Sequence, residues 1–263
     1  MKNINAMIAG ARGSGKTFFV LATIAQLATL PNFERNRLIG NSSLPTQIFC
    51  IDFKNSDLAR LASILPNGRV AINKREAINV VQKFDNLMHQ RLEFIKQQNF
   101  GSTASNLGMP LYYLIIDEWS ATNAAFNQGM GKDDKILRYK WSALINEIAM
   151  MGRLPGFGLI IISQQMSVVN SGVSSAIQEE AGLKVHFGDA NMSAYRLTFG
   201  DEVQIPEMHL DTGEAFAWIE GVATSGYVIP FAAPYIDTRN MWDVLIKALS
   251  NQDDEKYLFL TSR

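Results

Sequence analysis

One eight-residue stretch near the start of the chain constrains its fold more than any other part of the sequence. Residues 10–17 read GARGSGKT and match the pattern G-x-x-x-x-G-K-T. Residues 4–9 are an apolar run of strand length, and residues 17–30 carry a helical pattern. Glycines let such a loop wrap around phosphates with its N–H groups pointing inward, at the positive end of the helix. The stretch therefore predicts a phosphate-binding loop (P-loop) between a strand and a helix.

The side chains of this loop predict how it would hold ATP and Mg²⁺. We expect the Lys16 ammonium to reach the β- and γ-phosphates, and the Thr17 hydroxyl to be a Mg²⁺ ligand. Without nucleotide, Lys16 is expected to be solvated. The other residues expected to bind the nucleotide are Gly10, Ala11, Arg12, Gly13, Ser14 and Gly15.

A second motif ends an apolar run in the middle of the chain. Residues 111–116 read LYYLII and are followed by Asp117 and Glu118. In a parallel sheet, a fully apolar strand is buried on both faces and delivers its carboxyl end to the ligand-binding edge. We expect Asp117 to hold Mg²⁺ and Glu118 to orient and deprotonate the attacking water. Strands commonly end in acids, but after a P-loop in an alternating β/α chain this pattern predicts ATP hydrolysis.

The next apolar strand pattern ends in a polar pair. Residues 158–162 read GLIII and are followed by Ser163 and Gln164. We expect the Gln164 amide to sense the γ-phosphate or the attacking water. On these residues alone an alternative is equally well supported, in which Ser163 caps a helix and the glutamine is solvated.

Apolar strand patterns alternate with helical patterns along most of the chain, which predicts an α/β fold with a mostly parallel central sheet flanked by helices. Residues 214–220 and 227–231 are predicted to be two strands of a C-terminal edge hairpin. We expect a single ATPase domain, residues 1–249, followed by a tail, residues 250–263. The tail is expected either to fray or to dock on a neighbouring subunit.

Two segments between the motifs are interpreted from composition and spacing. Residues 58–65 are predicted to form a helix that Ser56 or Asp57 caps. Residues 121–131, which contain Asn, Gln and Gly, are predicted to form a mobile loop.

Composition limits the partners and the location of the chain. The 263 residues carry a formal net charge of −1, so any grip on a polyanion must come from local patches. Cys50 is the only cysteine, which excludes an intrachain disulfide. His89, His186 and His209 have no metal-binding spacing, and we interpret them as structural or solvated. No apolar run of 18 residues and no signal peptide occur, so a cytoplasmic chain is expected.

Several further segments make the chain resemble the motor domains of the FtsK/HerA superfamily of P-loop ATPases. The most specific is residues 147–164, EIAMMGRLPGFGLIIISQ, which resembles the family's helix, Gly-Arg, Gly-containing turn, apolar strand and Thr/Ser-Gln sensor. The other similar segments are residues 52–54 (DFK, Asp-x-Lys in the family), Met88 with Arg91 (Met-x-x-Arg) and residues 211–214 (DTGE, Pro-Gly before a strand). The resemblance covers residues 4–236.

The resemblance implies a RecA-like core that assembles as a hexameric ring, with ATP at the subunit interfaces and DNA as cargo. A neighbouring subunit would supply an arginine to the γ-phosphate. Arg153 in the Gly-Arg turn is the first candidate and Arg196 the second, although a surface or helix-end role is favoured for Arg196. Residues 163–166 depart from the family's Thr-Gln-Arg-Pro. We also expect this chain to lack the DNA-gripping layer, membrane helices and winged helix of FtsK. We therefore expect a minimal motor, or one that borrows these parts from a membrane-anchored or DNA-loading partner.

The surface that would contact DNA is weakly marked in the sequence. The candidate residues follow the predicted mobile loop and are Lys132, Lys135, Arg138 and Lys140. Repeated in every subunit of a ring, these residues would suffice for phosphate contacts. The alternative, a solvated helix face balanced by Asp133 and Asp134, is slightly favoured.

These features predict an ATP-driven nucleic-acid translocase that acts in DNA transfer, segregation or packaging for a plasmid, a conjugative element or a phage. Two alternatives stay open. One is a protein-secretion or filament-assembly ATPase with the same core, and the other is a regulatory switch that binds ATP with little hydrolysis. Glu118 argues against a switch, because a switch has little need for a poised base.

Overall fold

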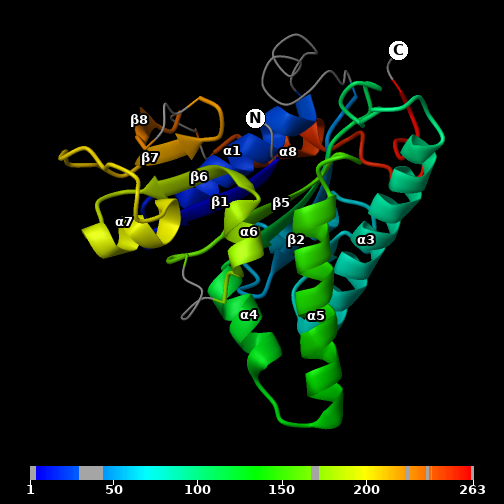
Figure 1. The fold of residues 1–263 in the computed structure, drawn as a ribbon, viewed down its shortest axis with the longest axis horizontal. Coiled ribbons are helices and arrows are strands. Elements are labelled where there is room, and N and C mark those ends of the chain that lie inside the picture. The colour runs from blue at the N-terminus through cyan, green and yellow to red at the C-terminus, as the bar shows by residue number, and fades with distance from the viewer. Residues whose placement is uncertain are drawn as a thin grey trace.

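The computed structural model describes residues 4–29, 44–166, 172–222, 226–234, 237 and 239–261. In these residues an eight-stranded sheet lies between two layers of helices (Figure 1). The strands are β1 (Asn5–Gly10), β2 (Gln47–Asp52), β3 (Val70–Ala71), β4 (Tyr112–Asp117), β5 (Phe157–Ile162), β6 (Ala181–Phe187), β7 (Glu214–Ile219) and β8 (Ile229–Ala232). The helices are α1 (Lys16–Thr29), α3 (Lys74–Lys96), α4 (Trp119–Asn127), α5 (Lys132–Met151), α6 (Ser175–Glu179), α7 (Met192–Phe199), α8 (Met241–Ala248) and the 3₁₀ helix η1 (Ala59–Ser63).

The strand order is β3-β2-β4-β5-β1-β6-β7-β8, and neighbouring strands from β3 to β6 are parallel. Every residue of β1, β2, β4 and β5 is buried, as their apolar runs predict. Gly10 pairs with Phe187 and Asp52 with Asp117, so the parallel strands end at one common edge. This carboxyl edge brings together the P-loop and the residues that follow β2, β4 and β5.

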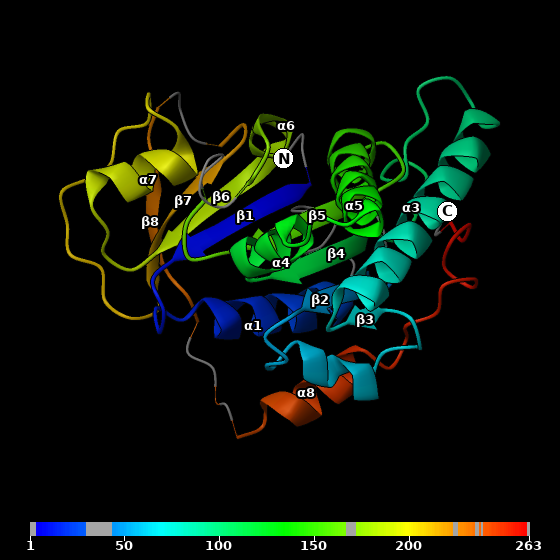
Figure 2. The same cartoon turned by 90° about the horizontal axis from the view of Figure 1, so that it is seen from below.

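The helices cover the two faces of the sheet unequally. Helices α3, α4, α5 and α6 lie on one face, and α1 and α8 lie on the other (Figure 2). Each face has its own apolar core because alternate residues of a strand point to opposite faces. Phe49 and Ile51, for example, belong to the first core, and Ile48 and Cys50 to the second.

The last three strands of the sheet are antiparallel. β7 pairs antiparallel with both β6 and β8, with Phe216 opposite His186 and Pro230. The predicted α/β fold with a C-terminal edge hairpin is therefore confirmed, and residues 223–225 of the connection lie outside the described residues. A small third core, formed by α7 and the outer strands, includes Tyr195, Phe199 and Phe216.

The prediction of a mobile loop at residues 121–131 was wrong, because helix α4 occupies most of this segment. Its buried residues Trp119, Thr122 and Phe126 follow helical spacing, and Phe126 stacks on Trp141 of α5 with ring centroids 4.4 Å apart. Figure 1 shows α4 and α5 side by side, extending away from the sheet and joined at their far ends. We call residues 119–140 the helical hairpin.

The predicted helix at residues 58–65 is instead the short 3₁₀ helix η1. The Asp52 carboxylate accepts hydrogen bonds from the backbone N–H groups of Lys54, Ser56 and Ala59. These bonds hold the chain in a tight turn directly after β2, which leaves room for only a short helix.

The described part of the C-terminal tail packs on its own chain and is not frayed. The buried Arg91 guanidinium donates to the carbonyl oxygens of Tyr257 (2.9 Å) and Leu258 (2.7 Å), and also to Pro110 O (2.7 Å). Arg69, also buried, donates to Asp254 Oδ1 at 2.7 Å. Among the described helices, none has both the length and the apolar character that crossing a membrane requires.

Candidate active site

The P-loop connects β1 to α1 in a conformation that depends on its glycines. Gly10, Gly13 and Gly15 have φ angles of 141°, 82° and 99°, which residues other than glycine rarely adopt. A Cβ atom at Gly10 would also lie 2.5 Å from Phe187 O on the neighbouring strand. The loop is braced at its other side, where Gly213 N donates to Ser14 O at 3.1 Å. Residues 211–214, singled out in the sequence, thus support the P-loop.

Lys16 is not freely solvated, contrary to the sequence expectation. Its Nζ donates to Gly10 O at 2.5 Å and to Ala11 O at 2.7 Å, so the side chain folds back over its own loop. Burial lowers the pKa of Lys16, and the nearby carboxylates of Glu118 and Asp117 partly offset this effect. In these contacts the Lys16 ammonium donates to carbonyl oxygens, whereas the P-loop hypothesis expects it to donate to phosphates.

Asp117, the last residue of β4, is buried at the carboxyl edge of the sheet. Burial raises its pKa to about 6, and Asp52 in register on β2 adds to the shift. Its Oδ1 accepts one hydrogen bond, from Glu118 N at 2.9 Å, and it forms no ion pair with a described residue. A buried carboxylate beside a second one is a site that a divalent cation would neutralise. The residues present therefore fit Mg²⁺, which Thr17 and Asp117 would hold and which would polarise phosphate oxygens when bound.

Glu118 follows in a strained backbone conformation. Its φ and ψ angles are 48° and 61°, the left-handed region that residues other than glycine seldom occupy. The carboxylate forms an ion pair with Lys54 Nζ and lies 3.4 Å from Gln164 Nε2. The strained turn between β4 and α4 thus directs the Glu118 carboxylate towards Lys54, which follows β2, and Gln164, which follows β5.

Lys54 is the main residue of the candidate site to which sequence reasoning gave no role. The Asp-x-Lys segment at residues 52–54 was identified, but no role was assigned to its lysine. In the structure Asp52 fixes the turn by accepting from Lys54 N at 3.0 Å, and the turn delivers the Lys54 ammonium to Glu118. The motif itself was the available signal, because the contact joins residues 64 positions apart.

Gln164 lies between the other two elements of the site because β5 lies between β1 and β4 in the sheet. Ser163 N donates to Ile8 O on β1 at 3.0 Å, and Ser163 Oγ lies 2.5 Å from Ser120 Oγ in α4. Of the alternative interpretation, the helix-cap role of Ser163 finds no support because no described helix begins there, whereas the side chain of Gln164 is exposed as that alternative expects. The placement of Gln164 beside Glu118 agrees with a sensor position.

The two candidate arginines lie at opposite edges of the sheet. Arg153 is exposed in the turn between α5 and β5, at the amino ends of the parallel strands and so at the opposite edge from the P-loop. Gly152 permits this turn, because a Cβ there would lie 1.9 Å from Phe157 O. Arg196 is exposed on α7, which follows β6 at the carboxyl edge. Arg153 would therefore have to act on the nucleotide of another subunit.

The four basic residues proposed to contact DNA lie in the first half of α5, near the far end of the helical hairpin. Arg138 is committed to structure, since its Nη2 donates to Asn127 O (2.8 Å) and Gly129 O (3.1 Å) at the end of α4. The other three, Lys132, Lys135 and Lys140, are exposed. Tyr139 is 75% exposed and Met130 93% exposed beside them, so lysines and apolar side chains alternate on this surface.

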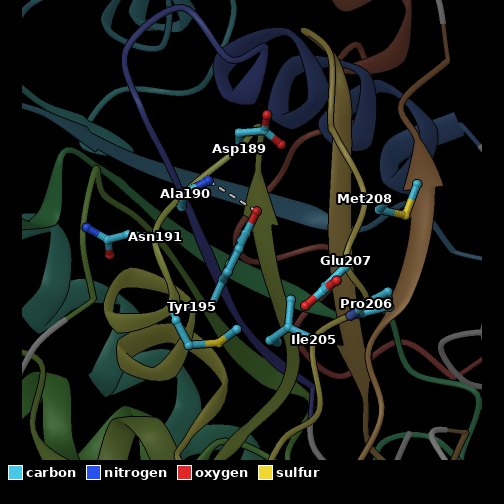
Figure 3. Close-up of a pocket in the computed structure, with 9 residues that line it drawn as sticks. Asp189, Ala190, Asn191, Tyr195, Ile205, Pro206, Glu207 and Met208 are labelled. Carbon is cyan, nitrogen blue, oxygen red and sulfur yellow. Dashed lines mark hydrogen bonds between the residues drawn. The ribbon is translucent and has the colours of Figure 1, made fainter.

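An open pocket of about 510 Å³ lies where the chain passes from β6 to α7 (Figure 3). Tyr195 rises through it from α7, and its hydroxyl accepts from Ala190 N at 3.1 Å and lies 3.3 Å from Gly188 O. Asp189 borders the pocket, pairs with His209 and accepts from Leu210 N at 2.6 Å. The sequence did not reveal this pocket.

Comparisons with known proteins relate this chain to an FtsK domain-containing protein. No protein-family model matches the chain. In sequence it is 25% identical over 233 residues to the FtsK domain-containing protein YdcQ of Bacillus subtilis (strain 168), a match that covers 88% of this chain and 43% of YdcQ. The chain thus spans less than half the length of this curated relative.

Two solved structures with similar folds cover nearly the whole chain. The pCW3 conjugation coupling protein TcpA, in a monomer form with ATPγS, has a TM-score of 0.67 at 13% identity and is matched over 93% of this chain and 65% of TcpA. The cytoplasmic domain of the Type VII secretion ATPase EccC of Thermomonospora curvata has a TM-score of 0.61 at 17% identity, over 98% of this chain and 29% of EccC. The resemblance to FtsK/HerA-type P-loop ATPases and the RecA-like fold are confirmed.

Proposed function

We propose that this chain, a homologue of an FtsK-domain protein, is the ATP-hydrolysing motor of a DNA translocase. The observation that carries hydrolysis is the position of Glu118, which strained backbone, Lys54 and Gln164 together hold at the carboxyl edge beside the P-loop. A protein that only binds nucleotide has no need to maintain such a strained carboxylate. DNA as the cargo is supported by the sequence relationship to an FtsK-domain protein and by the exposed lysines of the helical hairpin.

The described contacts suggest how the site would work. Phosphates entering the P-loop would take the Lys16 ammonium from the carbonyl oxygens of Gly10 and Ala11. Asp117 and Thr17 would hold Mg²⁺ against the same phosphates. Glu118 would accept the proton of the attacking water once Lys54 releases its carboxylate, because an ion-paired ammonium competes with water for that oxygen. Gln164 would report the presence of the γ-phosphate.

We place the working site between subunits of a ring, by analogy with the family. Arg153 or Arg196 of one subunit would approach the γ-phosphate held by its neighbour. The exposed lysines of each helical hairpin would contact the phosphate backbone of DNA, with Tyr139 available to pack against a base or sugar. A membrane-anchored or DNA-loading partner would supply attachment to the host process.

The test is an ATPase titration with duplex DNA, single-stranded DNA and no DNA, on protein verified as oligomeric. We expect DNA to raise the rate, and the rise to shrink with salt as phosphate contacts are screened. Glu118→Gln should abolish hydrolysis in all conditions while ATP binding persists. Lys135→Glu should reduce the DNA-stimulated increment more than the basal rate, and Lys247→Glu on the exposed side of α8 is the matched control.

The outcomes separate the proposed function from its rivals. Equal ATPase rates with and without DNA would contradict autonomous DNA translocation and favour a polypeptide cargo or a separate loading partner. Near-zero rates with tight ATP binding would favour the regulatory switch. Normal hydrolysis by Glu118→Gln would remove this residue from the role of base.

A further inference from the structure

A second cluster of ionisable side chains lies between α3 and α5, outside the nucleotide site. Asp85 and His89 are one helical turn apart on α3, and Glu147 faces them from α5. One ligand atom from each of these residues lies within 4.8 Å of those of the other two. Figures 1 and 2 show α3 and α5 adjacent on the same face of the sheet.

Asp85 is the unusual member of this cluster. Its side chain is 7% exposed, and its Oδ1 is buried without a hydrogen bond to any described residue. His89 Nε2 lies 2.8 Å from Glu147 Oε1 and 3.7 Å from Asp85 Oδ1. A ring nitrogen carries at most one hydrogen, so His89 can serve Glu147 or Asp85 but not both. The protein alone therefore leaves a buried carboxylate oxygen without a hydrogen bond, which is costly.

We propose that Asp85, His89 and Glu147 bind a divalent transition-metal ion, for which Zn²⁺ is the best fit, and that the ion fastens α3 to α5. Imidazole and carboxylate are ordinary Zn²⁺ ligands, whereas Mg²⁺ prefers an all-oxygen octahedron. Tetrahedral ligands with bonds of about 2.0 Å lie about 3.3 Å apart, which small side-chain rotations would reach here. His89 and Glu147 are 40% and 37% exposed, so the ion has a path from solvent and water can fill the fourth position.

The location gives such an ion a structural consequence. Asp85 and His89 lie in the middle of the long helix α3, and Glu147 lies near the end of α5, one turn before the Gly152-Arg153 turn. A bond between them would hold the base of the helical hairpin and the approach to Arg153 against the rest of the domain. This inference does not depend on the nature of the cargo.

The test uses the whole chain without nucleotide, in buffer containing excess Mg²⁺ to occupy any oxygen-only site. Zn²⁺ is titrated by calorimetry and by thermal unfolding. We expect one bound Zn²⁺ per chain and a rise in Tm of at least about 5 °C when free Zn²⁺ is a hundred times its Kd. Asp85→Asn and His89→Gln should each lose this rise. Asp85→Asn also removes the buried charge, so this variant is expected to fold.

His209→Gln is the matched control, because His209 also contacts two carboxylates, Asp189 and Asp211, but is exposed. This variant should keep the full Zn²⁺ response. Co²⁺ bound in place of Zn²⁺ should show the visible absorption of a tetrahedral nitrogen and oxygen site, and Asp85→Asn should abolish it. A Zn²⁺ response that survives in Asp85→Asn and His89→Gln, or that disappears in His209→Gln, would overturn the proposal. So would the absence of stoichiometric binding.

Discussion

At the scale of single residues, the fold places one carboxylate of the site, that of Asp117, where its ionisation is costly. Burial and the neighbouring Asp52 raise its pKa to about 6 from an ordinary value of 3.8. The folded chain therefore binds more protons than the unfolded chain between these two values. Ionised Asp117 costs stability fully above pH 6, and the cost disappears as the pH falls towards 4. A cation in the active site would remove this cost.

We expect Asp117→Asn to raise the free energy of unfolding at pH 7.5, in the absence of Mg²⁺ and nucleotide, by on the order of 1–2 kcal/mol. The amide keeps the oxygen that accepts from Glu118 N but carries no charge. Urea unfolding of wild type and variant at pH 7.5 and pH 4.5 is the measurement, and the gain should shrink at the lower pH. A gain that does not change with pH would mean that ionisation of Asp117 is not its source.

At the scale of secondary-structure elements, the helical hairpin depends on Arg138, which makes structural contacts that the nearby lysines do not make. Arg138 donates to the carbonyl oxygens of Asn127 and Gly129, so its charge closes the end of α4. Gly129 allows the close approach of Asp134, because a Cβ there would lie 2.2 Å from Asp134 Oδ2. The lysines beside Arg138 have no such partners among the described residues, which leaves them available to a ligand.

Arg138→Ala should therefore destabilise the domain by about 0.5–1.5 kcal/mol, since the orphan carbonyls at the end of α4 lose their charged donor. Lys135→Ala, three residues earlier on the same helix, should change stability by less than about 0.5 kcal/mol. Denaturant unfolding of both variants makes the comparison directly. Equal stabilities for the two variants would show that the Arg138 contacts contribute nothing, and would return this residue to the candidates for DNA contact.

At the scale of the whole molecule, the sheet separates the first candidate arginine, Arg153, from the P-loop of its own chain. Arg153 lies at the amino edge of the parallel strands and the P-loop lies at the carboxyl edge. A single chain therefore cannot bring Arg153 to its own nucleotide. Arg196 lies at the carboxyl edge on α7, where its carbonyl oxygen accepts from Gly200 N at 2.8 Å and its side chain is exposed.

The trans assignment predicts complementation between two inactive variants. Arg153→Ala should bind ATP and hydrolyse it poorly, and Lys16→Ala should fail to bind. Mixed assemblies should recover part of the activity, because an interface can combine an intact Lys16 with an intact Arg153 from the next subunit. The measurement is the ATPase rate against mixing ratio, in assemblies shown to exchange subunits. No recovery at any ratio would count against Arg153, and the same experiment with Arg196→Ala would then test the second candidate.

Local sequence was enough to predict the parts of this fold that depend on short-range patterns. The P-loop follows from its glycines and Lys16, and β4 follows from an unbroken apolar run that ends in Asp117 and Glu118. Helix α4 was missed because its small and polar residues resemble a loop. Three residues of α4, Trp119, Thr122 and Phe126, are buried. Their helical spacing indicates a helix only when α5 covers them. This segment is helical because it is buried against another element, and no local sequence pattern predicts that burial.

By itself, the sequence was enough to predict the nucleotide chemistry, because phosphate binding and an acidic strand end require particular residues at adjacent positions. Only the tertiary structure decided which distant residues meet. The order β4-β5-β1 places Gln164 beside Glu118, and the turn after β2 brings Lys54 to the same carboxylate. Packing of α3 on α5 joins Asp85 and His89 to Glu147, although their spacing in the sequence suggested no site. Such contacts follow from strand order and helix packing, which depend on the free energy of the whole core.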